Sequence, residues 1–247
     1  MTTTMTATIA TTIAVMGLPL SASTVLAESL TEYSTDRWIG GQAPLQIAQT
    51  DSTEFNPALT YVQRGLLFAR SGDYQQAIEQ FNLAIEMDPE LSVAYGNRGF
   101  TRVSMGDNEG AIEDFSRALE LEPDNAIMLA SRGITYAEMG DPEAALVDLD
   151  RSIEINPAFA PTYYNRGLVR IELEDSQGAL TDLTTTIELN GNFAEAYEAR
   201  GRLRSDLDDT EGAIEDLEQA AELFQAQRNN ASYRETMEEL ERLRGEE

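Results

Sequence analysis

The sequence contains no cysteine, no histidine and no lysine. Without cysteine there is no disulfide, no thiol nucleophile and no attachment point for a lipid anchor. Without histidine and lysine, most catalytic triads, Schiff bases, zinc sites and phosphate-gripping lysines are excluded. We therefore expect no catalytic residue, no metal site and no cofactor, and we predict that the protein is not an enzyme.

Positive charge is scarce and negative charge is abundant. The chain has 44 acidic residues against 17 basic residues, all of them arginine, and a formal net charge of -27. Such a surface repels nucleic acids and anionic membranes, so neither is an expected partner. Carboxylate clusters such as Glu172, Glu174 and Asp175 are the only support for an enzyme, and they are typical of the solvated faces of acidic helices.

Residues 1–27 contain no charged side chain, and residues 7–20 are apolar apart from threonines. This stretch has the length of the apolar core of a signal peptide and is short for a membrane span. Val25 and Ala27 occupy the small-residue positions before a cleavage site, and acidic residues begin at Glu28. We predict export and cleavage after Ala27. An uncleaved membrane anchor is the alternative, because no lysine or arginine precedes the apolar stretch. Residues 28–57 show no sustained hydrophobic period and indicate a flexible linker.

From residue 58 onward the sequence repeats at a fixed step of 34 residues without insertion or deletion. A step of this length is typical of a helix-turn-helix solenoid repeat. Five repeats are predicted, followed by residues 228–247 as a capping helix and tail. The repeats are residues 58–91, 92–125, 126–159, 160–193 and 194–227. Each contains one glycine, one alanine and one large apolar residue at matched positions: Gly65, Gly99, Gly133, Gly167 and Gly201; Ala77, Ala111, Ala145, Ala179 and Ala213; Phe81, Phe115, Leu149, Leu183 and Leu217.

The repeated positions carry a family resemblance. The first repeat has an aromatic, glycine, aromatic, alanine, aromatic, alanine and proline at the offsets of the tetratricopeptide repeat (TPR), namely Tyr61, Gly65, Phe68, Ala77, Phe81, Ala84 and Pro89. The chain thus resembles TPR proteins, and its acidic, exported layout is similar to that of exported TPR proteins of cyanobacteria. The resemblance implies an all-α solenoid, a right-handed superhelix of five repeats closed by a C-terminal helix. It also implies the periplasm or the thylakoid lumen as the destination.

Turn residues explain how each helix pair is connected. Gly72, Gly106 and Gly140 are expected to adopt the left-handed conformation that ends the first helix. Glu174 and Asp208 replace this glycine in the fourth and fifth repeats, at a cost of about 1 kcal/mol each if the conformation is kept. An aspartate follows in every repeat as the expected N-cap of the second helix. These aspartates are Asp73, Asp107, Asp141, Asp175 and Asp209.

The sequence also predicts where the second helices end and how the C-terminal segment folds. Pro89, Pro123 and Pro157 are expected to stop the second helices, whereas Gly191 and Gln225 replace this proline in the last two repeats. After the fifth repeat, an expected helix near residues 231–244 places four apolar residues on one face, where they would close the open end of the solenoid. These residues are Tyr233, Met237, Leu240 and Leu243.

Arginine also recurs at the 34-residue step, directly before the glycine. A row of guanidinium groups suits the binding of an acidic partner or of phosphates. The alternative, which we favour, is that each arginine pairs with an aspartate from a second recurring column, because acids outnumber bases. The two columns are Arg64, Arg98, Arg132, Arg166 and Arg200, and Asp114, Asp148, Asp182 and Asp216.

The TPR resemblance implies a concave groove lined by the first helix of each repeat. The matching positions are largely apolar, and we expect part of this set to pack against the next repeat. The fifth repeat has Glu195, Glu198, Arg202 and Asp206 instead, so a polar groove end is expected. We predict a non-catalytic scaffold or assembly factor that binds an apolar peptide or an amphipathic helix. The alternative is a structural TPR protein that associates with its own copy. The candidate groove residues are Val62, Leu66, Phe100, Val103, Ile134, Tyr164, Leu168 and Ile171.

Overall fold

The computed structural model describes residues 56–245, and this range contains eleven α-helices and no β-strand. The predicted signal peptide, and the predicted linker up to residue 55, lie outside the described residues. None of the helices within 56–245 combines the length and the apolar composition that a membrane span requires. The helices are α4 (Pro57–Arg70), α5 (Tyr74–Met87), α6 (Ser92–Ser104), α7 (Asn108–Leu121), α8 (Ala126–Glu138), α9 (Pro142–Ile155), α10 (Ala160–Glu172), α11 (Ser176–Leu189), α12 (Ala194–Asp206), α13 (Thr210–Ala226) and α14 (Asn230–Gly245).

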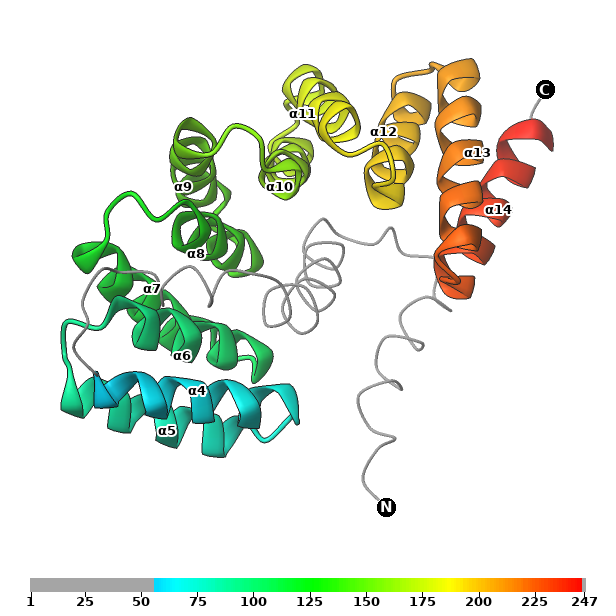
Figure 1. Ribbon diagram of the computed structural model, residues 1–247. Coiled ribbons are helices and arrows are strands. Elements are labelled where there is room, and N and C mark those ends of the chain that lie inside the picture. Colours follow the sequence, from blue (N-terminus) through cyan, green and yellow to red (C-terminus); the bar gives the residue numbers. More distant parts are fainter. Residues whose placement is uncertain (1–55, 246–247) are drawn as a thin grey trace.

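The helices form consecutive pairs, from α4 with α5 to α12 with α13, and each pair packs on the next. Figure 1 shows the pairs following one another along an arc, with α8, α10 and α12 on its inner side and α9, α11 and α13 on its outer side. This arrangement confirms the predicted all-α solenoid. The first helix of each pair lines the concave face, and the second helix forms the convex face.

The turns within the pairs use the left-handed conformation throughout. Gly72, Gly106 and Gly140 have φ angles of 80°, 79° and 78°. Glu174 and Asp208 keep this conformation, with φ angles of 59° and 62°. Because a side chain is disfavoured there, each of these two residues costs about 1 kcal/mol relative to glycine. The fourth and fifth repeats therefore retain the turn of the first three at some expense in stability.

Four of the five expected N-caps form. The carboxylates of Asp107, Asp141, Asp175 and Asp209 each accept a hydrogen bond from the backbone N–H three residues later, at 3.0–3.1 Å. Asp73 also occupies the predicted N-cap position, that of α5, but its carboxylate accepts no such bond. In the first repeat the residue at that position is Gln76, and its side-chain amide donates to the Asp73 carboxylate at 3.3 Å. The other four repeats have glycine or alanine there.

The ends of the second helices follow the prolines. α5, α7 and α9 each stop two residues before Pro89, Pro123 or Pro157. α11 ends at the same position in its repeat although Gly191 replaces the proline. α13 continues to 17 residues, compared with 14 in α5, because Gln225 has the amide hydrogen that proline lacks and is a better helix former than the glycine of the fourth repeat. A third non-glycine residue with positive φ, Arg228, then ends this longer helix.

Small residues allow the two helices of a pair to approach closely. The five recurring alanines, from Ala77 to Ala213, are fully buried. A Cβ atom added at Gly133 would lie 3.0 Å from the Ala145 carbonyl oxygen and 3.1 Å from Leu149 Cγ. Backbone atoms cannot move aside easily at such a distance, so the close contact requires glycine.

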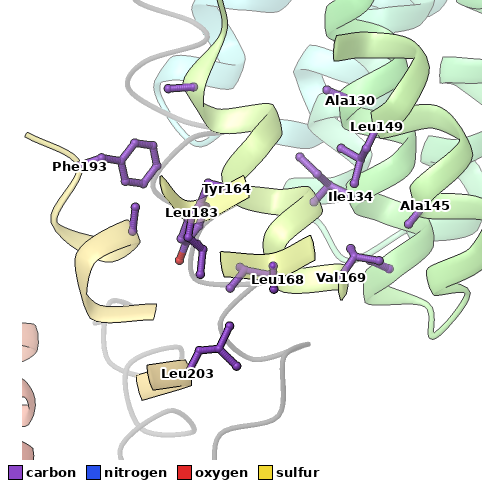
Figure 2. Close-up of a cluster of buried hydrophobic side chains, with 14 residues drawn as sticks. Ala130, Ile134, Ala145, Leu149, Tyr164, Leu168, Val169, Leu183, Phe193 and Leu203 are labelled. Atoms are coloured by element: carbon purple, nitrogen blue, oxygen red, sulfur yellow. The ribbon is translucent and has the colours of Figure 1, made fainter. Parts of the chain in front are cut away.

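The largest buried cluster joins the third, fourth and fifth repeats. Figure 2 shows side chains of α8, α9, α10 and α12 in this cluster, among them Ile134, Leu149, Leu168 and Leu203. The Tyr164 ring lies 4.9 Å from the ring of Phe193, measured between centroids. The core is thus continuous from one repeat to the next, as expected of a stacked array.

The C-terminal helix α14 closes one end of the solenoid. Leu240 and Leu243 are buried against Ala213, Leu217 and Ala221 of α13, and Tyr233 and Met237 pack beside them. The predicted apolar stripe and its capping role are therefore confirmed.

The opposite end is different. Leu67 of α4 is 64% exposed, whereas the residues at the same position in the next four repeats are at most 5% exposed. Those residues lie on helices that each pack on the second helix of the preceding pair, and α4 has no such helix before it among residues 56–245. This face of α4 is the uncovered end of the described solenoid. The four covered residues are Thr101, Thr135, Val169 and Leu203.

Candidate partner-binding surface

The recurring arginines are structural. In repeats two to five, each arginine makes paired hydrogen bonds of 2.6–3.1 Å to an aspartate on the second helix of its own repeat. The four aspartates, from Asp114 to Asp216, are only 1–5% exposed. Three of them accept from a second arginine four residues further along the first helix, at 2.8–2.9 Å. The favoured alternative of ion pairing is therefore confirmed, and a phosphate- or acid-binding row is excluded for these four arginines.

Each of these arginines also bonds to the preceding repeat. Its remaining terminal nitrogen donates, over 2.6–3.0 Å, to an oxygen on the previous second helix. The acceptors are Asn82, Ser116, Asp150 and Thr184, one for each of Arg98, Arg132, Arg166 and Arg200. The row of guanidinium groups therefore holds the stack together rather than facing a ligand.

The first repeat departs from this scheme. Arg64 is exposed, and within residues 56–245 it has no carboxylate partner. Its guanidinium lies 5.9 Å from the centroid of the Tyr61 ring. Gln80 occupies the position of the buried aspartate, and its Oε1 atom is buried without a hydrogen-bond partner among the described residues. The uncovered end of the solenoid thus also lacks the buried ion pair.

The eight predicted groove residues divide into two groups. Val62, Ile134, Tyr164 and Leu168 are at most 8% exposed and belong to the buried clusters, so they are the part of the set that packs against other helices and does not face the groove. The other four are partly exposed on the concave helices. The register of the repeat gives the position of each residue but not the neighbour that covers it. The partly exposed residues are Leu66, Phe100, Val103 and Ile171.

A small pocket lies between the first two repeats on the concave side. Leu66 and Phe100 supply its apolar walls, and Asn97 and Ser104 add polar atoms. The Phe100 ring is supported from behind by Phe115, with ring centroids 5.1 Å apart in an edge-to-face arrangement. Neither α4 nor α6 contains an acidic residue, so the helices that line this end of the concave face contribute no negative charge. The remaining lining residues are Ala69, Tyr74 and Thr101.

The expected polar groove end is occupied by the chain itself. Arg202 of α12 donates to Glu198 at 2.9 Å and to Glu239 of α14 at 2.8 Å. The Thr236 hydroxyl, also on α14, donates to Glu198 at 3.2 Å. These groups therefore fix the capping helix, so Glu198 and Arg202 of the predicted polar end are engaged with α14. The interacting residues are 37 and 38 positions apart, beyond the reach of the repeat pattern.

Two partly buried carboxyl groups have a raised pKa. Burial raises the pKa of Glu198 to about 7, although the nearby Arg202 and the Thr236 hydroxyl favour its charged form. Burial likewise raises the pKa of Glu138 to about 7, and a hydrogen bond from Asn108 acts in the opposite direction. Both groups take up a proton in the folded protein at a pH where the unfolded chain, with carboxyl pKa values near 4.5, remains ionised.

Stability is therefore expected to increase as the pH falls from about 8 to about 5, because only the folded state binds these protons. Thermal unfolding followed by circular dichroism across this range measures the effect. The Glu198→Gln variant, which cannot ionise, should show a smaller pH dependence than the wild type. An unchanged slope in the variant would mean that Glu198 does not titrate in this range.

Sequence reasoning missed one set of exposed residues. Met105, Met139 and Leu207 are 43–47% exposed, and Leu173 is partly buried at the same position of its repeat. All four immediately follow the first helix of a pair. Their 34-residue spacing is visible in the sequence, but they lie in the turns, outside the helical positions from which the groove residues were predicted.

In the part of the chain that the structure describes, no group of three or more acidic residues is arranged to hold a metal ion. The carboxylates of Glu172, Glu174 and Asp175 are exposed, on and after the last turn of α10. A helical solenoid of this kind, with a curved face and a small apolar pocket, is the architecture of a protein-interaction scaffold.

Comparison of the sequence with models of known protein families identifies the repeat. Models of the tetratricopeptide repeat match residues 58–91, 126–159 and 194–227, and a TPR repeat model matches residues 99–140. The chain belongs to the tetratricopeptide repeat family. A comparison with curated protein sequences found no match.

Solved structures share the fold at low sequence identity. MamA from Desulfovibrio magneticus RS-1 has a TM-score of 0.64 and 20% identity, over 69% of this chain and 96% of its own. YrrB, described as a TPR protein with an unusual peptide-binding site, has a TM-score of 0.59 and 19% identity, over 80% of this chain and 98% of its own. PilW, a type IV pilus biogenesis factor, has a TM-score of 0.63 and 17% identity, over 76% and 93%.

Proposed function

We propose that this protein is a non-catalytic interaction scaffold that binds an apolar peptide or the apolar face of an amphipathic helix at the α4–α6 end of its concave face. The observation that carries the proposal is the pocket between the first two repeats, where Leu66 and Phe100 form apolar walls beside Asn97 and Ser104. The pocket is small, with a volume of about 10 Å³, so an apolar side chain would lie against its walls and would not enter it. The Asn97 and Ser104 side-chain oxygens can accept hydrogen bonds from a flanking peptide backbone.

The distribution of carboxylates also favours the α4–α6 end of the groove as the binding site. The first helices of repeats three to five each contain at least one glutamate, whereas α4 and α6 contain none. An apolar segment therefore meets the smallest desolvation cost at the α4–α6 end, where no carboxylate on the lining helices must be stripped of water. The similarity to YrrB, whose description includes a peptide-binding site, is consistent with this class of ligand.

The Leu66→Asp/Phe100→Ser double variant is expected to lose its protein partners. A charge and a hydroxyl would replace the apolar walls, and a tenfold loss of affinity corresponds to about 1.4 kcal/mol. The measurement is a pull-down from native extract, quantified by mass spectrometry. The control is Leu83→Asp/Val147→Asp, which changes two residues of the second helices that are 40% and 69% exposed. Circular dichroism establishes that both variants are folded.

Proteins retained by the wild type and by the control, but not by the groove variant, would support the proposal. Equal retention by a folded groove variant would show that the pocket is not the binding site. Sedimentation velocity of the wild type decides the alternative of self-association, since a dimer that the groove variant abolishes would make the second copy the ligand.

A further inference from the structure

The turns between the two helices of each repeat carry a row of apolar residues that the fold does not require. We call this row, Met105, Met139, Leu173 and Leu207, together with the neighbouring carboxylates Glu172, Glu174, Asp206 and Asp208, the turn edge. In the first repeat the corresponding residue is Ser71. Its backbone N–H donates to the carbonyl groups three and four residues earlier, as that of Met105 does. The turn therefore forms equally well with a polar residue.

Three of the four apolar members of the turn edge are exposed, and Leu173 is partly buried. Met105, Met139 and Leu207 are 47%, 43% and 46% exposed. Because they stand at the same position in successive repeats, they lie along one edge of the solenoid instead of being scattered over its surface. Isolated exposed apolar residues are ordinary. What distinguishes these residues is that they recur at one turn position, beside exposed carboxylates.

The carboxylates of the turn edge give it a charge that increases along the solenoid. Residues 70–73 contain one arginine and one aspartate, whereas residues 172–175 and 206–209 contain three carboxylates each. The side chains of Glu172, Glu174, Asp206 and Asp208 are exposed and have no ion pair within residues 56–245. Glu174 and Asp208 also occupy the left-handed position that glycine fills in the first three repeats.

We propose that the turn edge is a second docking surface, distinct from the concave groove, and that it binds a basic amphipathic helix of a protein partner. The apolar face of such a helix would cover the methionine and leucine side chains, and its basic residues would lie among the carboxylates. Thioether side chains adapt to partners of varied shape. A second copy of this chain fits poorly, because two molecules of net charge -27 repel each other.

The test uses the full chain and a fluorescently labelled helical peptide of about 18 residues, with leucines on one face and lysines on the other. The comparison peptide has glutamate in place of each lysine. Fluorescence anisotropy is expected to show binding of the lysine peptide, weakened by salt, and no binding of the glutamate peptide. The Met139→Ser/Leu207→Ser variant introduces the residue type that the first repeat has at Ser71, and it is expected to bind the lysine peptide roughly tenfold more weakly.

A second variant separates binding from stability. Glu174→Gly/Asp208→Gly removes two carboxylates and relieves two strained residues. It should bind the lysine peptide several-fold more weakly, and its melting temperature should rise by about 4 °C. The matched control is Glu188→Gln/Glu222→Gln, which removes two exposed charges from α11 and α13. The control should keep the affinity of the wild type.

The proposal is overturned if the control loses as much affinity as Glu174→Gly/Asp208→Gly, because binding would then depend on net charge alone. It is also overturned if both peptides bind equally or if neither binds. Loss of the lysine peptide from the Leu66→Asp/Phe100→Ser variant, with both edge variants unaffected, would assign this ligand to the concave groove.

Discussion

Replacing Asp182 by alanine is expected to lower the free energy of unfolding by about 3 kcal/mol, because two partly buried guanidinium groups would lose their shared, buried carboxylate. Asp182 is 1% exposed and accepts from Arg166 at 2.6 Å and from Arg170 at 2.8 Å. Since so little of this site is open to solvent, water has little access to replace the lost bonds. Urea denaturation followed by circular dichroism measures the loss.

The neighbouring carboxylate provides the control. Asp150 also accepts from Arg166, at 2.7 Å, but it is 53% exposed. Asp150→Ala should cost less than about 1 kcal/mol, because water can solvate the freed group. Asp148→Ala should fall between the two, since Asp148 pairs with Arg132 and its repeat has Tyr136 in place of the second arginine. Equal losses in all three variants would contradict a role for buried charge.

An aspartate placed at the same repeat position should destabilise the protein strongly in the fifth repeat and hardly at all in the first. Leu203→Asp puts a carboxylate into the largest core cluster, at a site 5% exposed, and is expected to cost about 3 kcal/mol or more. Leu67→Asp puts the same group on the uncovered face of α4, at a site 64% exposed, and should change stability by less than about 0.5 kcal/mol.

Melting temperatures of the two variants and the wild type give the comparison. If Leu67→Asp destabilised the protein as much as Leu203→Asp, an element outside residues 56–245 or a second molecule would have to cover α4. Both variants carry the same substitution at the same repeat position. The main difference is that α12 packs on a preceding helix and α4 does not, within residues 56–245.

Most of the fold was predictable because its determinants are local and repeated. The left-handed glycines, four of the N-cap aspartates, the prolines and the apolar face of α14 each act within a few residues. Asp73 also stands at its predicted N-cap position, but its carboxylate accepts from the side-chain amide of Gln76 and not from a backbone N–H. Aspartate does cap the second helix in the other four repeats, where glycine or alanine stands in place of Gln76 and offers no side-chain donor.

The candidate site was less predictable because it depends on contacts between repeats. The spacing gave Ile134 and Leu168 positions on the first helices, but whether a residue faces a ligand or the next repeat depends on the size of its neighbours. Glu198 and Arg202 were assigned to an open groove because the pattern carries no information on how α14 packs against α12. The Met105 row went unnoticed because it follows the helices.

Each recurring arginine bonds both within its own repeat and to the preceding repeat, so the two ends of the stack are not equivalent. In a linear array, stability is a sum of terms within repeats and terms between neighbours. From the second repeat onward, one guanidinium contributes to both terms, since it bonds within its own repeat and to the one before. Arg64 makes neither bond in the described range, so the α4–α5 pair lacks the ion pair within the repeat and is joined to the next repeat by the single arginine bond from Arg98 to Asn82. No repeat packs on its other side within residues 56–245, so opening this pair breaks fewer of these bonds than opening an inner repeat. Fraying should therefore begin at this pair, which also forms one wall of the pocket, whereas α14 holds the far end closed.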